Sequence, residues 1–454
     1  MKIINPATGN IIEEISEDTI KTLADKLNLL KTGQQSWKVK TVEERLDKIE
    51  KFGEIIQGDV EELALILSTE TGKPIQQARN EIKGAHNRID HLMLNAPKWL
   101  AHEKVIQEGN TLESIEYEPL GVIANISAWN YPYNVGYNVF LYALTAGNGV
   151  LYKPSEYSSL TGKAITKRLY QAGIPENIFQ CSIGGREVGQ LILEMDFDGY
   201  FFTGSYSTGK YIAREVAHKL VPVQLELGGK DPLYVMEDVP DIKKAAINAA
   251  EGSFYNAGQS CCAIERIYVS EKIYESFLQY FIEEVSTYRL GDPTDENTFI
   301  GPLTRPQQLT ALSDQVKDAQ SKGASIALGG HPLKNSGNYF EPTIVVNTNH
   351  SMKIMKDESF GPIIGIQKVS SDEEAIELML DTDYGLTSAV FGSDEERVDI
   401  ILKAMNSGTV YWNCCDRVSP NIPWSGRKNS GLGSTLSTQG IRAFVQPKSY
   451  QMRP

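Results

Sequence analysis

Cysteine and histidine are scarce in this sequence of 454 residues, which contains five cysteines and six histidines. Four of the cysteines form two adjacent pairs, and adjacent cysteines can bridge only with a strained backbone. There is no Cys-x-x-Cys and no His-x-x-x-His pattern, so neither a disulfide framework nor a zinc site is expected. We therefore predict free thiols, no bound metal and a cytoplasmic location.

Long apolar runs and an excess of positive charge are also missing. No segment reaches the roughly 18 consecutive apolar residues of a membrane span, and residues 1–6 lack the apolar core of a signal peptide. The net charge of −14 argues against nucleic-acid binding, which requires clustered lysines and arginines. With 41% hydrophobic and 22% charged residues, the chain is typical of a globular protein, and its length predicts two or three domains.

Residues 20–100 are predicted to be mostly helical. Thr41 and Glu44 have the spacing of a capping box, in which each side chain bonds the backbone N–H of the other residue. Apolar residues then recur at helical spacing, which predicts a buried helix face formed by Leu46, Ile49, Phe52 and Ile56.

From about residue 119, short β-rich runs alternate with helical ones. This pattern predicts an α/β protein with parallel sheets covered by helices on both faces. The first series contains predicted strands at 122–126, 149–152, 178–182, 199–202 and 221–225, with helices at 157–172 and 188–194. The second series contains predicted strands at 233–236, 266–269, 343–346, 363–369, 388–391 and 408–412, with helices at 271–288 and 372–380.

Ligands of such sheets bind at the carboxyl ends of the strands. Three polar segments, 127–130, 153–156 and 203–205, fall at those ends. The turn at 226–229 joins the two series, where a cleft between domains is expected.

Two segments carry groups suited to covalent catalysis. Residues 224–230 read Gln-Leu-Glu-Leu-Gly-Gly-Lys, and residues 254–262 read Phe-Tyr-Asn-Ala-Gly-Gln-Ser-Cys-Cys. A thiolate can attack a carbonyl carbon, and a carboxylate can then activate water against the resulting thioester. The residues alone leave other interpretations open, because a cysteine can be an inert core residue and Glu226 can simply pair with Lys230.

Both segments resemble signature motifs of the NAD(P)-dependent aldehyde dehydrogenase superfamily. The Glu-Leu-Gly-Gly-Lys box matches at 226–230 and the Phe-x-x-x-Gly-Gln-x-Cys box at 254–261. Further matches at 129–132, 202–205, 358–362 and 426–431 extend the resemblance over essentially the whole chain.

This resemblance implies a division into three parts. A Rossmann-like NAD-binding domain would comprise residues 1–98 and 120–228, and an α/β catalytic domain carrying the thiol would comprise 229–430. Residues 99–119 and 431–454 would form a small β oligomerisation sheet, in which segments 111–118 and 444–451 join subunits. A homodimer or homotetramer is therefore expected.

The resemblance also assigns the catalytic roles. Cys261 is implied to be the nucleophile, Glu226 the general base and Asn130 the oxyanion donor. Because a free glutamate has a pKa of about 4.3, burial is expected to raise that of Glu226. The implied reaction is the NAD-dependent oxidation of an aldehyde to a carboxylic acid through a thiohemiacetal and a thioester on Cys261. From local sequence alone, Asn130 can equally be a turn residue before Pro132.

The implied cofactor contacts are Ile126, Ser127, Trp129, Lys153, Ser155, Glu156, Gly185, Phe202, Gly204, Ser205, Thr208, Leu227, Glu358 and Phe360. Lys153 and Glu156 would hold the adenosine ribose, and the Glu156 carboxylate would repel a 2′-phosphate, favouring NAD while leaving NADP possible. The alternative for this pair is a solvated loop. Glu358 and Phe360 would hold the nicotinamide ribose and ring, the alternative being a loop carboxylate and a core aromatic residue.

The implied substrate pocket contains Tyr131, Asn134, Val135, Asn138, Tyr255, Ser260, Cys262 and Arg417. Its polar members favour a small polar aldehyde or a semialdehyde. Arg417 lies in a loop at 414–418 that would close the mouth of the substrate pocket. It can pair with the remote carboxylate of a semialdehyde or remain a solvated cation.

The sequence argues against three other functions. Relatives that transfer the acyl group to CoA generally lack the carboxylate that Glu226 supplies. An inactive relative would have lost Cys261, Glu226 or Asn130, and all three are present. A thiol hydrolase needs a histidine near the thiol, and His218 and His331 lie in no recognisable motif.

Overall fold

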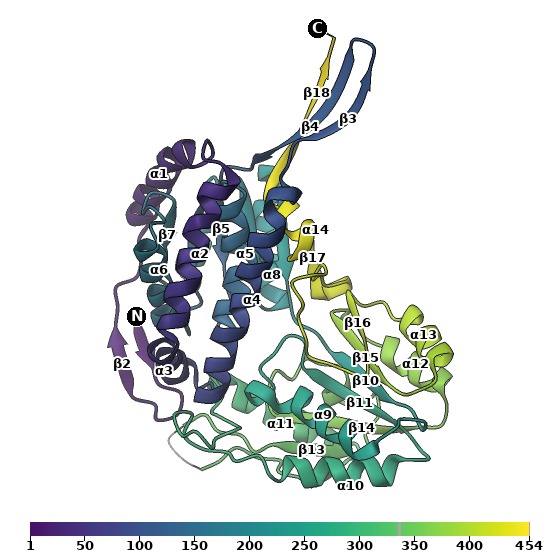
Figure 1. Cartoon of the computed structure of the whole chain (residues 1–454). Helices are drawn as coiled ribbons and strands as arrows, with labels where there is room; N and C mark the ends of the chain where they lie inside the picture. The colour runs from purple at the N-terminus through teal and green to yellow at the C-terminus, as the bar shows by residue number, and fades with distance from the viewer. Residues whose placement is uncertain (335–336, 454) are drawn as a thin grey trace.

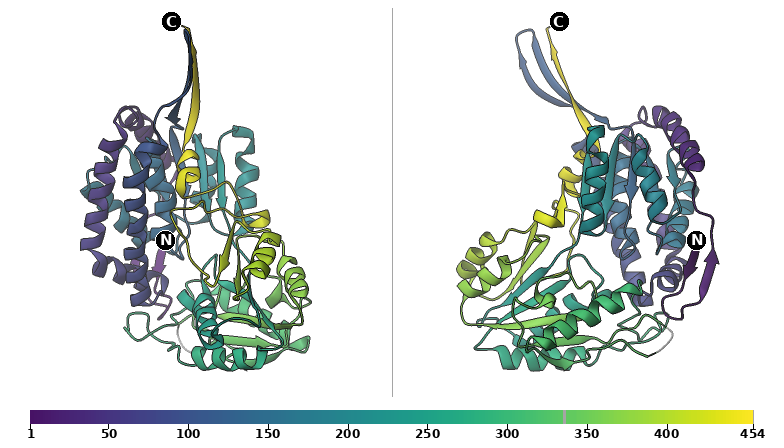
Figure 2. Two further views of the ribbon diagram at one scale, coloured as in Figure 1. Left: turned by 45° about the vertical axis from the view of Figure 1, so that its right-hand side comes forward. Right: turned by 180° about the vertical axis from the view of Figure 1, so that it is seen from behind.

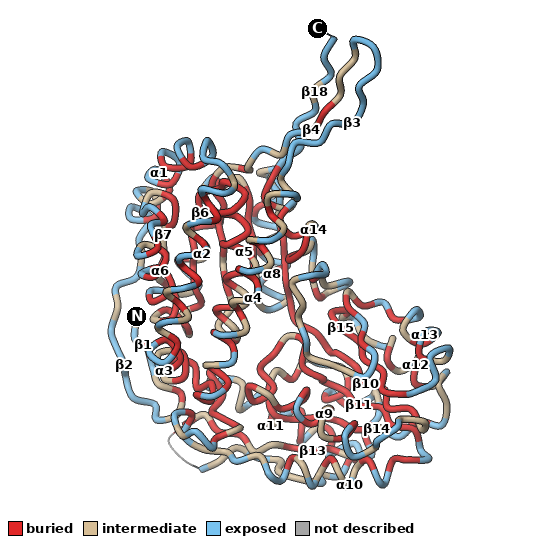
Figure 3. The backbone as a smooth tube through the Cα atoms, viewed as in Figure 1, coloured by how far each residue is buried: buried red, intermediate tan, exposed pale blue. Residues whose placement is uncertain are grey.

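The structure, a computed structural model that describes residues 1–334 and 337–453, has two α/β bodies and a projecting arm of strands (Figure 1). The first body is built on a six-stranded sheet and the second body on a seven-stranded sheet. Buried residues fill both bodies, whereas the arm is mostly exposed (Figure 3). None of the helices in the described ranges combines the length and apolar character that a membrane span requires.

The predicted helical region is confirmed by four helices, α1 (Ile20–Trp37), α2 (Val42–Gly58), α3 (Val60–Thr71) and α4 (Ile75–Trp99). The Thr41 hydroxyl accepts from the Glu44 N–H at 3.2 Å, and the Glu44 carboxylate accepts from the Thr41 N–H at 2.8 Å. The capping box is therefore present, and the predicted apolar stripe of α2 is buried.

The six-stranded sheet has the order β17-β9-β8-β5-β6-β7. Its strands are β5 (Val122–Ile126), β6 (Gly149–Lys153), β7 (Phe179–Cys181), β8 (Gly199–Thr203), β9 (Val223–Glu226) and β17 (Gly431–Leu432). Neighbours are parallel except β17, which is antiparallel to β9.

Helices cover both faces of this sheet (Figure 2). The connecting helices are α5 (Pro132–Thr145), α6 (Ser159–Gln171), α7 (Arg186–Glu194), α8 (Tyr206–Val216) and the short η1 (Ala217–Lys219). α5 and α6 share one core with α2 and α4, whereas α1, α7 and α8 share another core on the opposite face.

The seven-stranded sheet has the order β12-β13-β14-β11-β10-β15-β16. Its strands are β10 (Asp231–Val235), β11 (Ile264–Ser270), β12 (Ser325–Leu328), β13 (Thr343–Val346), β14 (Ile363–Val369), β15 (Thr387–Phe391) and β16 (Thr409–Trp412). β12 is antiparallel to β13, and the other neighbours are parallel.

The helices of this body are α9 (Ile242–Phe254), η2 (Tyr255–Gly258), α10 (Tyr274–Val285), α11 (Gln307–Ser321), η3 (Lys353–Met355), α12 (Asp372–Leu380) and α13 (Glu395–Ala404). They share one large core with the sheet.

The arm consists of β3 (Glu103–Glu108), β4 (Thr111–Pro119) and β18 (Val445–Met452), with β4 in the centre. β18 pairs antiparallel with β4 from Val445 opposite Pro119 to Met452 opposite Leu112. The two predicted β segments therefore pair with each other, although 326 positions separate Pro119 from Val445 in the sequence. The short η4 (Lys428–Ser430) and α14 (Ser437–Arg442) lie on the path to β18.

Several elements were not identified from the sequence. They include β1 (Lys2–Ile4) and β2 (Ile11–Glu14), which form a hairpin, and β3, α11, β12 and α13. β2 and β3 are exposed at every residue, so they lack the alternation of buried and exposed positions that predicts a strand.

Candidate functional site

The carboxyl ends of adjacent parallel strands form the floor of the site. Ile126 at the end of β5 lies beside Lys153 of β6 and Phe202 of β8. On the other side of β8, Thr203 lies beside Glu226 of β9. Residues far apart in the sequence therefore meet at one edge of the sheet, where ligands of such sheets bind.

A cavity of about 620 Å³ lies at this edge. It is lined by eleven of the fourteen expected cofactor contacts, namely Ile126, Ser127, Trp129, Lys153, Ser155, Glu156, Gly185, Phe202, Gly204, Ser205 and Thr208. The other three, Leu227, Glu358 and Phe360, are not part of this lining. Phe360 nevertheless packs edge-on against Trp129, with 5.6 Å between the ring centres, so it borders the cavity.

Lys153 brings unused hydrogen-bond donors to this cavity. The side chain is buried, and the hydrogen bond of its Nζ is a long one of 3.4 Å to the Pro154 oxygen. Burial lowers the pKa of Lys153, because a charged ammonium is poorly solvated there. Glu156, which is half-buried in the same lining, offers acceptors beside these donors. Together they suit the hydroxyl groups of a sugar.

The amino end of α8 suits a phosphate group. Ser205 is its N-cap, and the Ser205 hydroxyl accepts from the Thr208 N–H at 3.4 Å. The remaining free N–H groups of the first turn and the helix dipole attract negative charge. Near α7, no atom lies within 4 Å of the position that a Gly185 Cβ would take, so a ligand can approach the backbone there. The donors and the space fit a dinucleotide.

Glu226 ends β9 as a buried carboxyl group without a partner. Neither of its oxygens has a hydrogen bond among the described residues, and 7% of its surface is exposed. Burial raises the pKa of Glu226 well above its ordinary value. Once ionised, a carboxylate with a raised pKa is a stronger base toward water than an ordinary glutamate.

Lys230 does not pair with Glu226. Its Nζ donates to Glu265 at 2.7 Å and to the Ser359 hydroxyl at 3.0 Å. The alternative interpretation of Glu226 as the ion-pair partner of Lys230 is therefore wrong.

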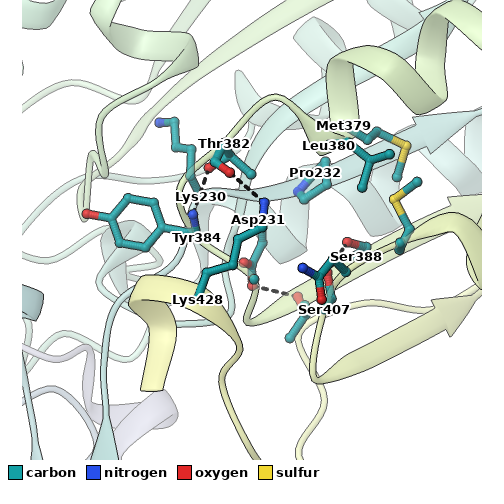
Figure 4. A pocket seen from close by; sticks show the side chains of 14 residues that line it. Lys230, Asp231, Pro232, Met379, Leu380, Thr382, Tyr384, Ser388, Ser407 and Lys428 are labelled. Carbon is teal, nitrogen blue, oxygen red and sulfur yellow. Dashed lines mark hydrogen bonds between the residues drawn. The ribbon is translucent and has the colours of Figure 1, made fainter. Parts of the chain in front are cut away.

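Lys230 and Asp231 also border a small hollow in the second body, together with Thr382, Tyr384 and Lys428 (Figure 4). Its space of about 10 Å³ suffices for roughly one water molecule and excludes an organic ligand.

Cys261 lies in a turn between η2 and β11 and is half-buried. Asn256 and Ala257, just before it, both have φ of +54°, and Gly258 has φ of +69°. Two hydrogen bonds hold the Gln259 side chain. It donates to the main-chain oxygen of Asn256 at 3.2 Å and accepts from the Thr304 N–H at 3.0 Å. This succession of left-handed residues, which few side chains tolerate, indicates a turn that the surrounding structure maintains.

Asn130 connects the first body to this turn. Its Nδ2 donates to the Gln259 oxygen at 3.1 Å, two residues before Cys261. The main-chain oxygen of Asn130 accepts from the Lys73 ammonium at 2.7 Å and from the Asn256 side-chain amide at 3.2 Å. The second N–H of the Asn130 amide is left for another acceptor near the thiol.

Cys262 has a different environment from Cys261. It is buried, and its thiol donates to Asp416 at 3.1 Å. The neighbouring Cys261 thiol, burial and the Asp416 carboxylate raise the pKa of Cys262 well above its ordinary value. The Ser260 hydroxyl donates to the same carboxylate at 3.2 Å, and burial raises the pKa of Asp416 to about 6. Cys262 is thus held as a neutral thiol.

A second cavity, of about 270 Å³, lies next to this turn. Its lining contains Tyr255 and Arg417 from the expected substrate pocket, together with Asn80, Asn248, Glu251, Gly252, Asn413, Cys414, Cys415 and Asp416. The Asn80 amide donates to the Tyr255 hydroxyl at 3.1 Å. Arg417 is exposed here, as expected for a residue at a mouth.

Four more of the expected pocket residues lie on or just before α5. Tyr131, Asn134, Val135 and Asn138 are half-buried, and none of them lines either of these two cavities. Tyr131 packs beneath Lys73, whose Nζ lies 3.7 Å from the ring centre. Tyr131 therefore packs against the residue that connects α3 and α4.

Sequence reasoning missed several supporting residues. Lys73 and Glu81 form a fully buried ion pair, and Glu81 also accepts from the Tyr133 N–H at 2.9 Å. Glu265 accepts from the backbone N–H groups of Ser359 and Phe360 at 2.8 and 2.9 Å. The Gly72-Lys73-Pro74 turn was the available signal for Lys73, whereas nothing local distinguishes Glu81 or Glu265 from a solvated carboxylate.

Comparison with known proteins agrees with this arrangement. The model of the aldehyde dehydrogenase family matches residues 1–450. The peroxisomal aminoaldehyde dehydrogenase 2 of Pisum sativum is 34% identical over 458 residues, which cover 98% of this chain and 91% of that protein. The NAD(P)+ succinate semialdehyde dehydrogenase Sad of Escherichia coli (strain K12) is 31% identical, covering 97% and 95%.

Solved structures give the same result. The crystal structure of an indole-3-acetaldehyde dehydrogenase in complex with NAD+ superposes with a TM-score of 0.96 at 30% identity, covering 100% of this chain and 93% of that one. The aldehyde dehydrogenase KauB from Pseudomonas aeruginosa gives the same values. The chain therefore belongs to the aldehyde dehydrogenase family and is an NAD(P)-dependent aldehyde dehydrogenase.

Proposed function

We propose that this enzyme oxidises a small polar aldehyde or semialdehyde to the carboxylic acid through a covalent intermediate on Cys261, with NAD as the preferred cofactor. The observation that carries the proposal is the buried, unpartnered carboxyl group of Glu226 in the same junction as a half-buried thiol. Gly229, three residues after Glu226, is so close to the thiol turn that its Cβ position lies 2.9 Å from the Cys261 oxygen. This proximity supports a shared site for the proposed base and nucleophile.

In the first step, the Cys261 thiolate attacks the aldehyde carbon, and the carbonyl electron pair moves to the oxygen. The free Asn130 N–H and the Cys261 backbone N–H donate to the resulting oxyanion. A dinucleotide held by the cavity residues would supply the hydride acceptor that conversion of this adduct to a thioester requires. Glu226 then takes a proton from water, and the hydroxide attacks the thioester carbon. The carbon–sulfur bond breaks, the acid leaves and the Cys261 thiolate is restored.

The 620 Å³ cavity supports the cofactor assignment. Lys153 and Glu156 would hold the adenosine ribose, and the amino end of α8 would hold the pyrophosphate. The Glu358 carboxylate, which accepts from the Gly229 N–H at 3.2 Å, and Phe360 would hold the nicotinamide side. Glu156 disfavours a 2′-phosphate by charge repulsion, which supports NAD over NADP.

Two further expectations remain proposals. The five cysteines are free, which supports a reducing compartment such as the cytoplasm. The projecting arm has β3 and β18 as its edge strands, and such edges pair readily with a second copy of the chain, which supports a homo-oligomer. Light scattering of the purified protein would measure the number of subunits.

The test is NADH formation over a panel of aldehydes, with NAD and NADP in parallel. We expect turnover with NAD that disappears in Cys261→Ser, because the serine hydroxyl is a far weaker nucleophile. Turnover that survives this substitution would contradict the covalent mechanism. Acyl transfer that requires CoA would instead favour the CoA-acylating alternative.

A further inference from the structure

Three buried polar side chains stand at intervals of four residues where α3 is joined to α4, namely Lys73, Gln77 and Glu81. Lys73 lies just before α4, and Gln77 and Glu81 share one face of that helix. None of the three lines the cavity of about 620 Å³ or that of about 270 Å³. Any part that they play in the reaction must therefore pass through other residues.

Lys73 and Glu81 hold the segment that contains Asn130 at both of its ends. The Lys73 ammonium donates to the main-chain oxygen of Asn130 at 2.7 Å, and the Glu81 carboxylate accepts from the Tyr133 N–H at 2.9 Å. Lys73 and Glu81 also pair with each other. Because hydrogen bonds to charged groups are short and strong, this ion pair fixes the main chain of residues 130–133.

Gln77 holds the thiol turn, residues 256–261. Its side-chain oxygen accepts from the Asn256 N–H at 2.8 Å, and its amide donates to the Phe299 oxygen at 2.9 Å. Asn256 has φ of +54°, a conformation that persists only where the surrounding structure maintains it. Gln77 therefore fixes the main chain at the start of the thiol turn.

Asn256 then connects the two segments. Its side-chain amide donates to the main-chain oxygen of Asn130 at 3.2 Å and to that of Gln259 at 3.1 Å. The Asn130 side chain donates to the same Gln259 oxygen. Because residues 130–133 belong to the first body and the thiol turn to the second, the contacts made by α4 determine where one lies relative to the other.

We propose that Lys73, Gln77 and Glu81 are positioning residues that set the distance between the Asn130 amide and the Cys261 thiol. This inference rests on the proposed function, because it takes the roles of Asn130 and Cys261 from there. An oxyanion donor must lie about 2.7–3.1 Å from the oxygen that becomes charged. Without the contacts of α4, the main chain of Asn130 is free to shift, and a misplacement of about 1 Å can cost roughly 100-fold in rate.

The probe is para-nitrophenyl acetate, whose acyl group can pass to a thiolate without a dinucleotide and without knowledge of the natural aldehyde. The Cys261 thiolate attacks the acetyl carbon, the carbonyl oxygen becomes an oxyanion, and para-nitrophenolate leaves as the thioester forms. Stopped-flow absorbance of the nitrophenolate measures the rate of this acylation. A wild-type rate in Cys261→Ser would contradict the proposed nucleophile and overturn the inference with it.

The test is a double-mutant cycle between this face of α4 and Asn130. Lys73→Met/Glu81→Gln removes the donor to Asn130 without leaving an unpaired charge, and the introduced amide can still accept from the Tyr133 N–H. We expect the acylation rate to fall about 10- to 100-fold in this variant. Added to Asn130→Ala, the same change should cause no further fall, because the amide that it displaces is absent.

Two kinds of failure can be told apart. Losses that multiply in the combined variant would assign the ion pair a structural role and overturn the inference alone, as would a wild-type rate in Lys73→Met/Glu81→Gln. A wild-type rate in Asn130→Ala would contradict the proposed role of Asn130 and overturn both.

Alkylation of Cys261 by iodoacetamide is the control, because no oxyanion forms in that reaction. Its rate in Lys73→Met/Glu81→Gln should equal that of the wild type, and an equal loss in both reactions would indicate a disturbed thiol and overturn the inference. If this variant does not fold, Gln77→Leu replaces it, since leucine is also a good helix former. We expect Gln77→Leu to lower acylation about tenfold with alkylation unchanged, and an unchanged acylation rate would overturn the inference.

Discussion

The side-chain amide of Asn130 donates to the main-chain oxygen of Gln259 at 3.1 Å, so the proposed oxyanion donor of one body is attached to the turn of the other body that carries Cys261. The contact holds the amide against Gln259, two residues before Cys261, before any substrate arrives. Preorganised donors of this kind stabilise developing charge because they need not reorient during the reaction.

Replacing this amide should therefore slow the chemical step. We expect Asn130→Ala to lower kcat by about 100- to 1,000-fold, the usual effect of losing one oxyanion donor. Steady-state kinetics would measure it. The rate of alkylation of Cys261 is the control, because an unchanged rate shows that the thiol turn remains in place. A kcat within threefold of wild type would contradict the role of Asn130.

The two adjacent thiols should react differently with iodoacetamide. Cys262 is buried, with a raised pKa and a hydrogen bond to Asp416, whereas Cys261 is half-buried in the turn. Because alkylation requires an accessible thiolate, we expect Cys261 to be labelled first at pH 7. Peptide mass spectrometry would identify the site, and Cys261→Ser is the control. Faster labelling of Cys262 would reverse the assignment of the nucleophile.

The pH dependence of hydrolysis should follow Glu226. Its pKa is raised by burial, and only the ionised carboxylate can take a proton from water. The rate of thioester hydrolysis should fall as the pH decreases through this raised pKa. In Glu226→Gln we expect this acidic limb to vanish and NADH to appear as a burst of about one equivalent per site, followed by slow turnover. Stopped-flow absorbance would resolve the burst.

The same group predicts a change in stability. A carboxyl group whose pKa is raised on folding stabilises the fold below its unfolded pKa, and that stability is lost as the pH rises through the folded pKa. Glu226→Gln removes this penalty at high pH. We expect its melting temperature to exceed that of the wild type at pH 8 more than at pH 4.5. A difference independent of pH would show that Glu226 does not titrate with a raised pKa.

The buried pair of Lys73 and Glu81 should matter for folding as well as for catalysis. Lys73→Met leaves the Glu81 carboxylate buried without its partner, which we expect to destabilise the protein by about 3–5 kcal/mol. Chemical unfolding would measure the change in free energy. The double variant Lys73→Met/Glu81→Gln should recover much of it, because no unpaired charge remains. A double variant as unstable as the single one would indicate that packing, not charge, is the cause.

Glu156 should control the choice of cofactor. We expect Glu156→Ala to raise the ratio of kcat/KM with NADP to that with NAD by about tenfold, since about 1.4 kcal/mol of charge repulsion corresponds to that factor. Parallel assays with both cofactors would measure the ratio. Lys153→Met is the matched variant, because it should weaken both cofactors without reversing their order. An unchanged ratio in Glu156→Ala would place the 2′-position elsewhere.

The parallel strands were predictable from the sequence because each forms a short, continuous apolar run followed by a polar segment. β5 and β8 lie in the interior of the six-stranded sheet and agree closely with their predicted ranges. β2 and β3 were missed because their side chains are exposed throughout, so pairing rather than burial defines them. Local sequence does not encode a partner strand.

The site shows the same division. Cys261 and Glu226 stand in contiguous motifs, so their neighbours in sequence are also their neighbours in space. Glu81, by contrast, looks like an ordinary charged residue of an amphipathic helix. Only the packing of α4 shows that it is buried against Lys73.

The strand that carries Glu226 is completed by residues translated much later. Gly431 of β17 pairs with Glu226, and the Leu227 N–H donates to the Ser430 oxygen at 3.0 Å. Residues 430–432 leave the ribosome long after those of β9, so the edge of β9 beside Glu226 can pair only once they have been made. A chain terminated before residue 430 would leave this edge of the sheet unpaired.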